Sequence, residues 1–187
     1  METPVARVLL SEEVRLALAA ELGHLRSRAG DVAWVAPENL HVTVKFLGSV
    51  AEERLPAVGR AVGAVAAASR PFSLIVSGLG AFPTVTRPRV VWAGLGPGTE
   101  ALAALAGQVE EALAALGFAR EGRPFVGHVT LGRRRQPRPD AGLARTLVAA
   151  AGRRFGRTVV DRLVLMRSDL GPRGARYTPL ESWPLGA

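Results

Sequence analysis

A short pattern that occurs twice in this chain of 187 residues constrains its fold more than any other feature. Residues 40–44 read Leu-His-Val-Thr-Val, and residues 127–131 read Gly-His-Val-Thr-Leu. In both copies a histidine and a threonine flank an apolar residue, which is the alternation of a β-strand with one buried face. We therefore expect two strands, one in each half of the chain, whose polar side chains share one face. The four polar residues are His41, Thr43, His128 and Thr130.

Apolar spacing elsewhere predicts helices and strands in alternation. Four helices are expected, from Ser11 to Gly30, Glu52–Ala68, Gly98–Leu116 and Ala141–Ala151, with Asp140 as an N-cap. The expected strands are Val5–Leu10, Val32–Val35, Leu40–Leu47, Phe72–Val76, Arg89–Ala93, Phe125–Arg133, Thr158–Arg167 and Arg176–Pro184. The Gly- and Pro-rich segment from Gly78 to Pro83 is predicted to be a loop.

This order of elements indicates an α+β fold. Helices and strands come in pairs, twice along the chain. We expect two similar lobes, each an antiparallel sheet with helices packed outside, and an active-site cleft between them. The length suits one bilobal domain that spans residues 1–187.

The charge of the chain points to an anionic partner. The formal net charge is +8, and 23 of the 24 basic residues are arginine. A nucleic acid or a phosphate ester would suit this balance, because arginine binds phosphate with two parallel hydrogen bonds. A base-composition bias of the genome would produce the same excess of arginine, and both explanations stay open. No apolar run approaches the roughly 20 residues that span a bilayer, so we expect a cytoplasmic protein with no membrane partner.

Two histidines on one face can perform acid–base chemistry. Imidazole gains or loses a proton near neutral pH, so a neutral and a protonated ring can act as base and acid on one phosphorus atom. The alternatives are polar histidines on half-buried strands, and a zinc site, which lacks a third ligand at a recognisable spacing. We therefore expect neither a metal nor another cofactor. His24, beside Arg26 and Arg28, is explained by a solvated helix face.

The sequence also resembles a known family. Residues 37–48, Pro-Glu-Asn-Leu-His-Val-Thr-Val-Lys-Phe-Leu-Gly, resemble the first motif of LigT-like RNA 2′,3′-cyclic phosphodiesterases, a branch of the two-histidine phosphoesterases. Residues 125–133 are similar to the second motif of that family. Segments 78–82 and 87–92 are similar to the part of the family between its motifs, and segments 163–170 and 174–177 are similar to its C-terminal part, so the resemblance covers nearly the whole chain.

The resemblance implies roles for individual residues. His41 would donate a proton to the departing 3′ oxygen of a cyclic phosphate, and His128 would accept a proton from the attacking water. Thr43 and Thr130 would bind the phosphate, and Arg133 would help to hold the nucleotide. By strand alternation Lys45 is expected on the face of His41, where it would steer phosphate or stay exposed.

Phe46 and Phe125 alternate away from the histidines and are expected in the core. Three positions depart from the family pattern, because Val5 and Met166 stand where aromatic residues are expected and Gly127 stands where proline is common. These departures bear on stacking of the substrate base more than on the proton chemistry.

The sequence thus predicts a monomeric enzyme that hydrolyses 2′,3′-cyclic phosphate at the ends of RNA to a 2′-phosphate. The first alternative is a 2′–5′ RNA ligase that joins tRNA halves through the same site in the reverse direction. The second is an RNA-binding module without turnover, for which the positive charge would suffice. Binding alone, however, does not require a matched pair of proton-transfer groups.

Overall fold

The computed structural model describes residues 3–171 and 174–186. Within these ranges the α-helices are α1 (Glu12–Arg26), α2 (Leu55–Ala68), α3 (Thr99–Ala114) and α4 (Ala141–Ala149), and short 3-10 helices cover Pro37–Asn39 and Glu52–Arg54. The strands are β1 (Pro4–Leu9), β2 (Ala33–Trp34), β3 (His41–Phe46), β4 (Phe72–Thr84), β5 (Arg87–Leu95), β6 (Val129–Arg133), β7 (Arg154–Val160), β8 (Arg162–Gly171) and β9 (Gly174–Pro184). No helix in these ranges is long and apolar enough to cross a membrane.

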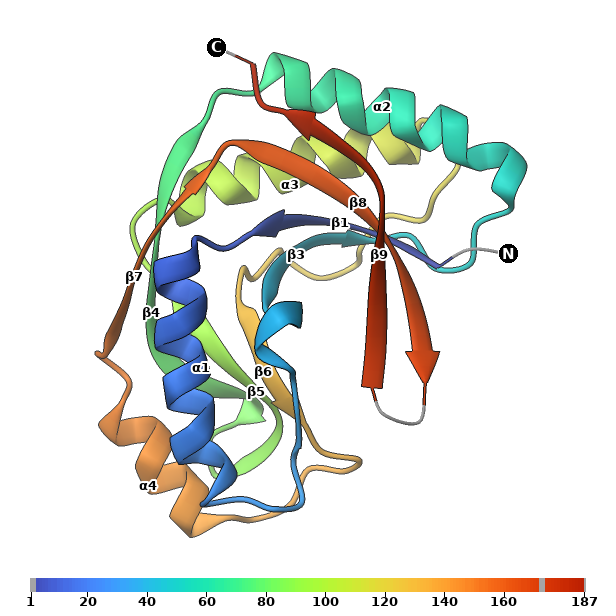
Figure 1. Ribbon diagram of the computed structural model, residues 1–187. Coiled ribbons are helices and arrows are strands. Elements are labelled where there is room, and N and C mark those ends of the chain that lie inside the picture. The colour runs from blue at the N-terminus through green and yellow to red at the C-terminus, as the bar shows by residue number, and fades with distance from the viewer. Residues whose placement is uncertain (1–2, 172–173, 187) are drawn as a thin grey trace.

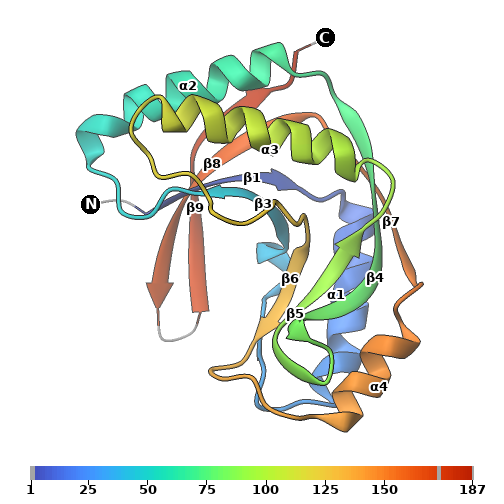
Figure 2. The same ribbon diagram turned by 180° about the vertical axis from the view of Figure 1, so that it is seen from behind.

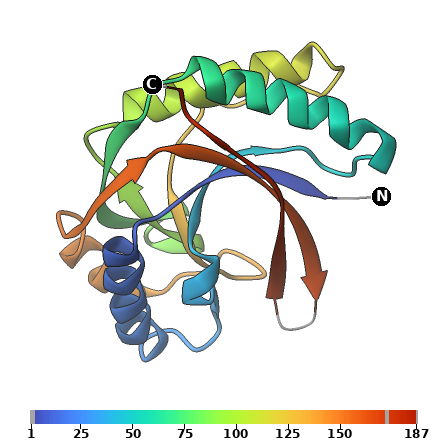
Figure 3. The same cartoon turned by 45° about the horizontal axis from the view of Figure 1, so that its top comes forward.

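The strands form one curved antiparallel sheet in the order β7-β4-β5-β6-β3-β1-β8-β9, with β2 beside β6. Helices α1 and α4 cover the half built from β4 to β7 (Figure 1), while α2 and α3 lie side by side over β8, β9 and β3 (Figures 2 and 3). The predicted α+β class with antiparallel strands and outer helices is confirmed. The sequence predicted a separate sheet in each lobe. The structure has a single sheet instead, because β3 pairs with β6 at Val42 and Val129.

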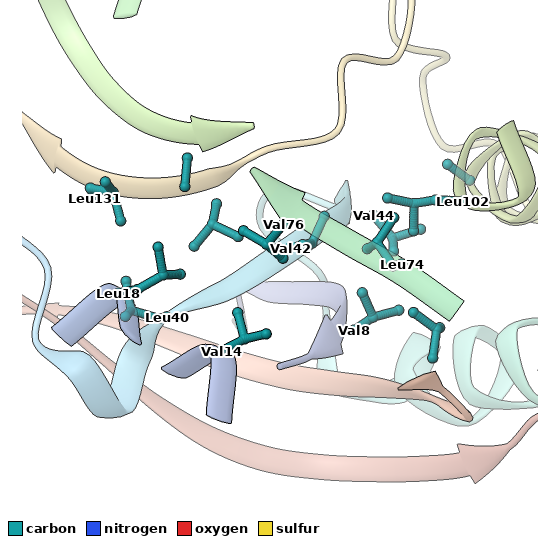
Figure 4. Packing of buried hydrophobic residues seen from close by; sticks show 14 of the residues in the cluster. Val8, Val14, Leu18, Leu40, Val42, Val44, Leu74, Val76, Leu102 and Leu131 are labelled. Atoms are coloured by element: carbon teal, nitrogen blue, oxygen red, sulfur yellow. The ribbon is translucent and has the colours of Figure 1, made fainter. Parts of the chain in front are cut away.

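The helix start predicted at Ser11 and the N-cap predicted at Asp140 both form. The Ser11 side chain accepts a hydrogen bond from the Val14 amide at the start of α1, and Asp140 accepts one from the Leu143 amide at the start of α4. Each cap satisfies an amide that has no partner inside its helix. The buried face of α1 then packs into the core that both halves of the sheet share. Figure 4 shows Val14 and Leu18 of this helix near Leu40, Val42 and Leu131.

The predicted loop at residues 78–83 is wrong, because these residues continue strand β4. Gly78 has a φ of 78° and lies where the register of β4 against β5 shifts, so it forms an irregularity within a strand. Gly80 lies opposite Trp92, and a Cβ atom at this position would overlap the indole ring. Glycine here makes room for a cross-strand aromatic residue, a role that local sequence cannot distinguish from a turn.

The predicted strand from Thr158 to Arg167 is in fact two strands. Asp161 separates the end of β7 from the start of β8, and the two strands run in different directions (Figure 1). β7 pairs with β4 in one half of the sheet, whereas β8 pairs with β1 in the other. The apolar run is nearly continuous because both strands are buried on one face, so hydrophobicity alone did not reveal the break between them.

We predict opposite effects for two glycine substitutions. Gly80→Ala would overlap the Trp92 ring and should lower the free energy of unfolding by about 1–3 kcal/mol, the usual cost of overpacking. The matched control is Gly107→Ala, because Gly107 lies on the exposed side of α3 and a Cβ there meets no atom within 4 Å. The control should be more stable by about 0.5–1 kcal/mol. Urea unfolding measures both, and an unchanged Gly80→Ala protein would contradict the packing described.

Candidate active site

The pairing of β3 with β6 brings the two His-x-Thr motifs together. Val42 lies directly opposite Val129, and both side chains are fully buried in the core. Because neighbouring strand residues point to opposite faces, the histidines and threonines on either side of the two valines share the other face. Continued by one residue on each side, this antiparallel register would place His41 beside Thr130, and His128, which directly precedes β6, beside Thr43. The sequence predicted this grouping, although not which strands would be neighbours.

Both histidines are held by the same local contact. Nδ1 of His41 lies 2.6 Å from the carbonyl oxygen of Asn39, and Nδ1 of His128 lies 2.8 Å from that of Val126. A carbonyl only accepts hydrogen bonds, so each Nδ1 must carry the hydrogen and donate it. When the ring is neutral, Nε2 is therefore the unprotonated nitrogen. Each ring thus presents the lone pair of Nε2 for proton transfer.

An aromatic ring contacts each histidine edge to face. The Tyr177 ring centroid is 5.1 Å from that of His41, with an interplanar angle of 75°. The Phe82 centroid is 5.3 Å from that of His128, with an angle of 84°. Neither contact was predicted from the sequence, because β9 and β4 reach the histidines only through the long-range strand order. The one sequence feature that could have drawn attention to these two aromatic residues is their scarcity, since the chain has one Tyr and six Phe.

The other predicted substrate-binding residues differ in their placement. The Thr43 hydroxyl lies 3.1 Å from Nε2 of His41, and Thr130 is half-buried on the same face. Arg133 ends β6 with an exposed side chain, and its charge acts on both histidines. These three residues are therefore positioned around the imidazole pair.

Lys45 does not share the face of His41, contrary to the prediction. In the pairing of β1 with β3, Ala6 lies opposite Lys45 and Arg7 lies opposite Thr43, so Val44 is an extra residue in β3. Such a bulge reverses the alternation that follows it. Lys45 is 8% exposed and donates hydrogen bonds to Glu110 Oε1 in α3 (2.7 Å) and to the carbonyl of Ala119 (2.8 Å).

The same bulge overturns the prediction for Phe46. This side chain is 63% exposed, not part of the core, because the extra residue turns it away from the helices. Phe125, by contrast, is partly buried and packs against the core.

Arg7 of β1 is a site residue that sequence reasoning missed. Its side chain is 5% exposed, and its Nη1 atom lies 3.2 Å from Nδ1 of His41. The guanidinium also stacks on the Tyr177 ring at 4.6 Å from the centroid. In the sequence Arg7 is one arginine among 23, and only the pairing of β1 with β3 reveals its position.

The surroundings disfavour the charged form of both rings. Burial lowers the pKa of His41 to about 4; the hydrogen bond to Asn39 opposes this change, and the charges of Arg7, His128 and Arg133 add to it. Burial also lowers the pKa of His128, against the hydrogen bond to Val126 and together with the charge of Arg133. Both rings are therefore neutral at pH 7 when the site is empty.

The donor set near the histidines is poor in metal ligands. Across residues 3–171 and 174–186, no three or more His, Asp or Glu side chains are grouped so that they could hold a metal ion. The polar groups described at this face are two imidazoles, two hydroxyl groups and nearby guanidinium groups.

Curated relatives resemble most of this chain. A Geobacillus stearothermophilus protein named RNA 2′,3′-cyclic phosphodiesterase is 35% identical over 95% of the chain, which spans 55% of that relative. An Archaeoglobus fulgidus protein of the same name is 38% identical over 82% of the chain and 84% of its own length. One from Thermus thermophilus is 35% identical over 95% of the chain and 87% of its own length.

Solved structures and a family model agree with these relatives. A Thermus thermophilus structure superposes with a TM-score of 0.81 at 31% identity and covers 98% of this chain and 97% of its own. E. coli LigT complexed with 3′-AMP superposes with a TM-score of 0.78 at 27% identity and covers 98% of both chains. The model of the 2′-5′ RNA ligase superfamily matches residues 14–172. A match over most of the chain, together with this fold, shows that the protein belongs to the 2′-5′ RNA ligase superfamily.

Proposed function

We propose that this protein hydrolyses the 2′,3′-cyclic phosphate at the ends of RNA to a 2′-phosphate. The observation that carries the proposal is the pair of imidazoles on one face, each with Nδ1 bound to a carbonyl, so that Nε2 is the nitrogen left for proton transfer; Nε2 of His41 contacts the hydroxyl of Thr43. Support also comes from relatives at 31–38% identity that are named RNA 2′,3′-cyclic phosphodiesterase.

In the proposed reaction the histidines act on opposite sides of the phosphorus. Nε2 of His128 takes a proton from water as the water oxygen forms a bond to phosphorus. The bond from phosphorus to the 3′ oxygen breaks, and protonated His41 supplies a proton to that oxygen. The phosphate stays on the 2′ oxygen. After the reaction His128 is protonated and His41 is neutral, and proton exchange with the solvent restores the starting states.

The remaining residues of the face hold the phosphate. Thr43 and Thr130 present hydroxyl groups that can donate to the non-bridging oxygens, and Arg133 contributes positive charge. Lys45 takes no part, because it is buried in its ion pair with Glu110. A phosphate anion beside Nε2 of His41 favours the imidazolium, so binding of substrate supplies the condition under which His41 can act as an acid.

The reverse reaction would use the same atoms with a 5′-hydroxyl group in place of water. We infer that cyclic phosphate ends of tRNA fragments are among the substrates, and that joining of such fragments is the second reaction to test. We infer a cytoplasmic location, because RNA fragments arise there, and a monomer, because one chain contains both histidines of the proposed site.

Substitution of the histidines provides the main test. His41→Ala and His128→Ala should each lower kcat on a 2′,3′-cyclic nucleotide by about 10²–10⁴-fold, because each removes one proton-transfer group. The double variant should lose much less than the product of the two single losses, since the residues act as a unit. Steady-state kinetics measures all three variants.

The control is His24→Ala, because His24 lies on an exposed part of α1 and should not affect the rate. Circular dichroism of each variant checks that the fold is intact. A folded His41→Ala or His128→Ala protein with kcat within about threefold of the parent would lose under 1 kcal/mol of barrier stabilisation, and the mechanism would fail.

The position of the phosphate in the product tests the leaving group. Hydrolysis of a 2′,3′-cyclic nucleotide should yield the 2′-phosphate, because His41 is proposed to protonate the 3′ oxygen. Phosphorus NMR distinguishes the two isomers directly. A 3′-phosphate product would mean that the 2′ oxygen leaves and that the proposed assignment of the two histidines is reversed.

A third test removes divalent metals. Turnover should be unchanged in EDTA, because imidazoles fill both proton-transfer roles. The rate is measured before and after chelation on the same protein. Loss of activity that zinc or manganese restores would refute the metal-independent mechanism.

A further inference from the structure

Among the residues that the structure describes, Arg7 is a buried cation without an anionic partner. No carboxylate in the described part of the chain forms an ion pair with it, and its buried Nε atom has no hydrogen-bond partner. Its surroundings are instead the Nδ1 side of His41 and the face of the Tyr177 ring. A buried charge is costly unless it is compensated, so a guanidinium in this place calls for a function.

The contact between Arg7 and His41 is not a conventional hydrogen bond. Nδ1 of His41 already donates its hydrogen to the Asn39 carbonyl at 2.6 Å, so the Arg7 N–H at 3.2 Å faces another donor. A positive group held there disfavours a second positive charge on the imidazole. The electrostatic influence of Arg7 on His41 therefore comes from direct contact.

Arg7 is poorly placed to bind the reacting phosphate itself. The hydroxyl of Thr43 marks the substrate side of His41, because it lies against Nε2. Arg7 lies against the other nitrogen and is 5% exposed. Its influence on the reaction therefore passes through the groups that it contacts, which are His41 and the Tyr177 ring beside it.

We propose that Arg7 is a positioning residue that keeps His41 uncharged until an anionic substrate arrives and makes the resulting imidazolium a stronger acid. The proposal rests on the function proposed above. In the empty site the guanidinium repels a proton on His41. When the phosphate binds at Nε2, its negative charge offsets the positive charge of Arg7, and His41 can then be protonated.

The other charged or titratable groups around His41 do not replace Arg7. His128 and Arg133 face it from the β6 side, and Tyr177 faces it from β9. Burial is the largest cause of the lowered pKa of His41, and Arg7 is the largest charge that contributes. For His128, burial comes first, and Arg133 is the charge that acts. Arg7 thus distinguishes two otherwise similar rings.

Titration of the free protein by NMR tests the proposal. With isotope-labelled histidine the chain gives three imidazole signals, from His24, His41 and His128, which single substitutions assign. Arg7→Met keeps an unbranched side chain without charge, and the His41 midpoint should rise by about one pH unit. Arg7→Lys keeps the charge and should leave the midpoint near that of the parent. The His128 signal is the internal reference and should not move in either variant.

An unchanged His41 midpoint in Arg7→Met would overturn the proposal, because burial alone would then account for the neutral ring. Equal rises in Arg7→Met and Arg7→Lys would also overturn it, since packing and not charge would be responsible. The titration requires no substrate. Its outcome therefore stands apart from any failure to hydrolyse cyclic phosphates.

The pH dependence of kcat gives the second readout. The alkaline limb, where His41 loses its proton, should move to higher pH in Arg7→Met and stay in place in Arg7→Lys. A change in KM with no movement of this limb would identify Arg7 as a substrate ligand and contradict the proposal. If the parent protein has no turnover on a 2′,3′-cyclic nucleotide, the proposed function fails, while the titration still decides the effect of Arg7 on His41.

Discussion

The pairing of Val42 with Val129 is the contact on which the architecture and the candidate site both depend. It joins β3 to β6 and thereby links the half of the sheet under α2 and α3 to the half that α1 and α4 cover. Both valines are buried in the shared core. Since strand residues alternate in direction, anchoring two valines inside fixes two histidines and two threonines on the opposite face.

The two histidines are similar in their local contacts and different in their charge environment. Each donates from Nδ1 to a carbonyl two residues earlier and meets an aromatic ring edge to face. Only His41 has a guanidinium against Nδ1. This contact disfavours a proton on His41, so in the proposed reaction the charge of the substrate phosphate must offset it before His41 can act as the acid.

Local chemistry accounts for the parts of the fold that were predicted correctly. Ser11 and Asp140 cap helices through side-chain hydrogen bonds to amides three residues ahead, so nearby sequence suffices to identify them. The strands next to the two histidines were recognised for the same reason, although β6 begins only at Val129, so the predicted strand was too long at residues 125–128. The break at Asp161 and the role of Gly80 were not recognised, because they depend on which strand lies alongside, and the run of residues does not encode that by itself.

The sequence alone determined which residues can carry the chemistry, because the alternation of polar and apolar residues in each strand is local. Tertiary structure decided which of them meet. One extra residue, Val44, turned Lys45 towards Glu110 and away from the site, and the same register set Arg7 beside Thr43. Register between distant strands follows from the packing of the whole core, so no pattern around residue 7 or residue 45 could reveal it.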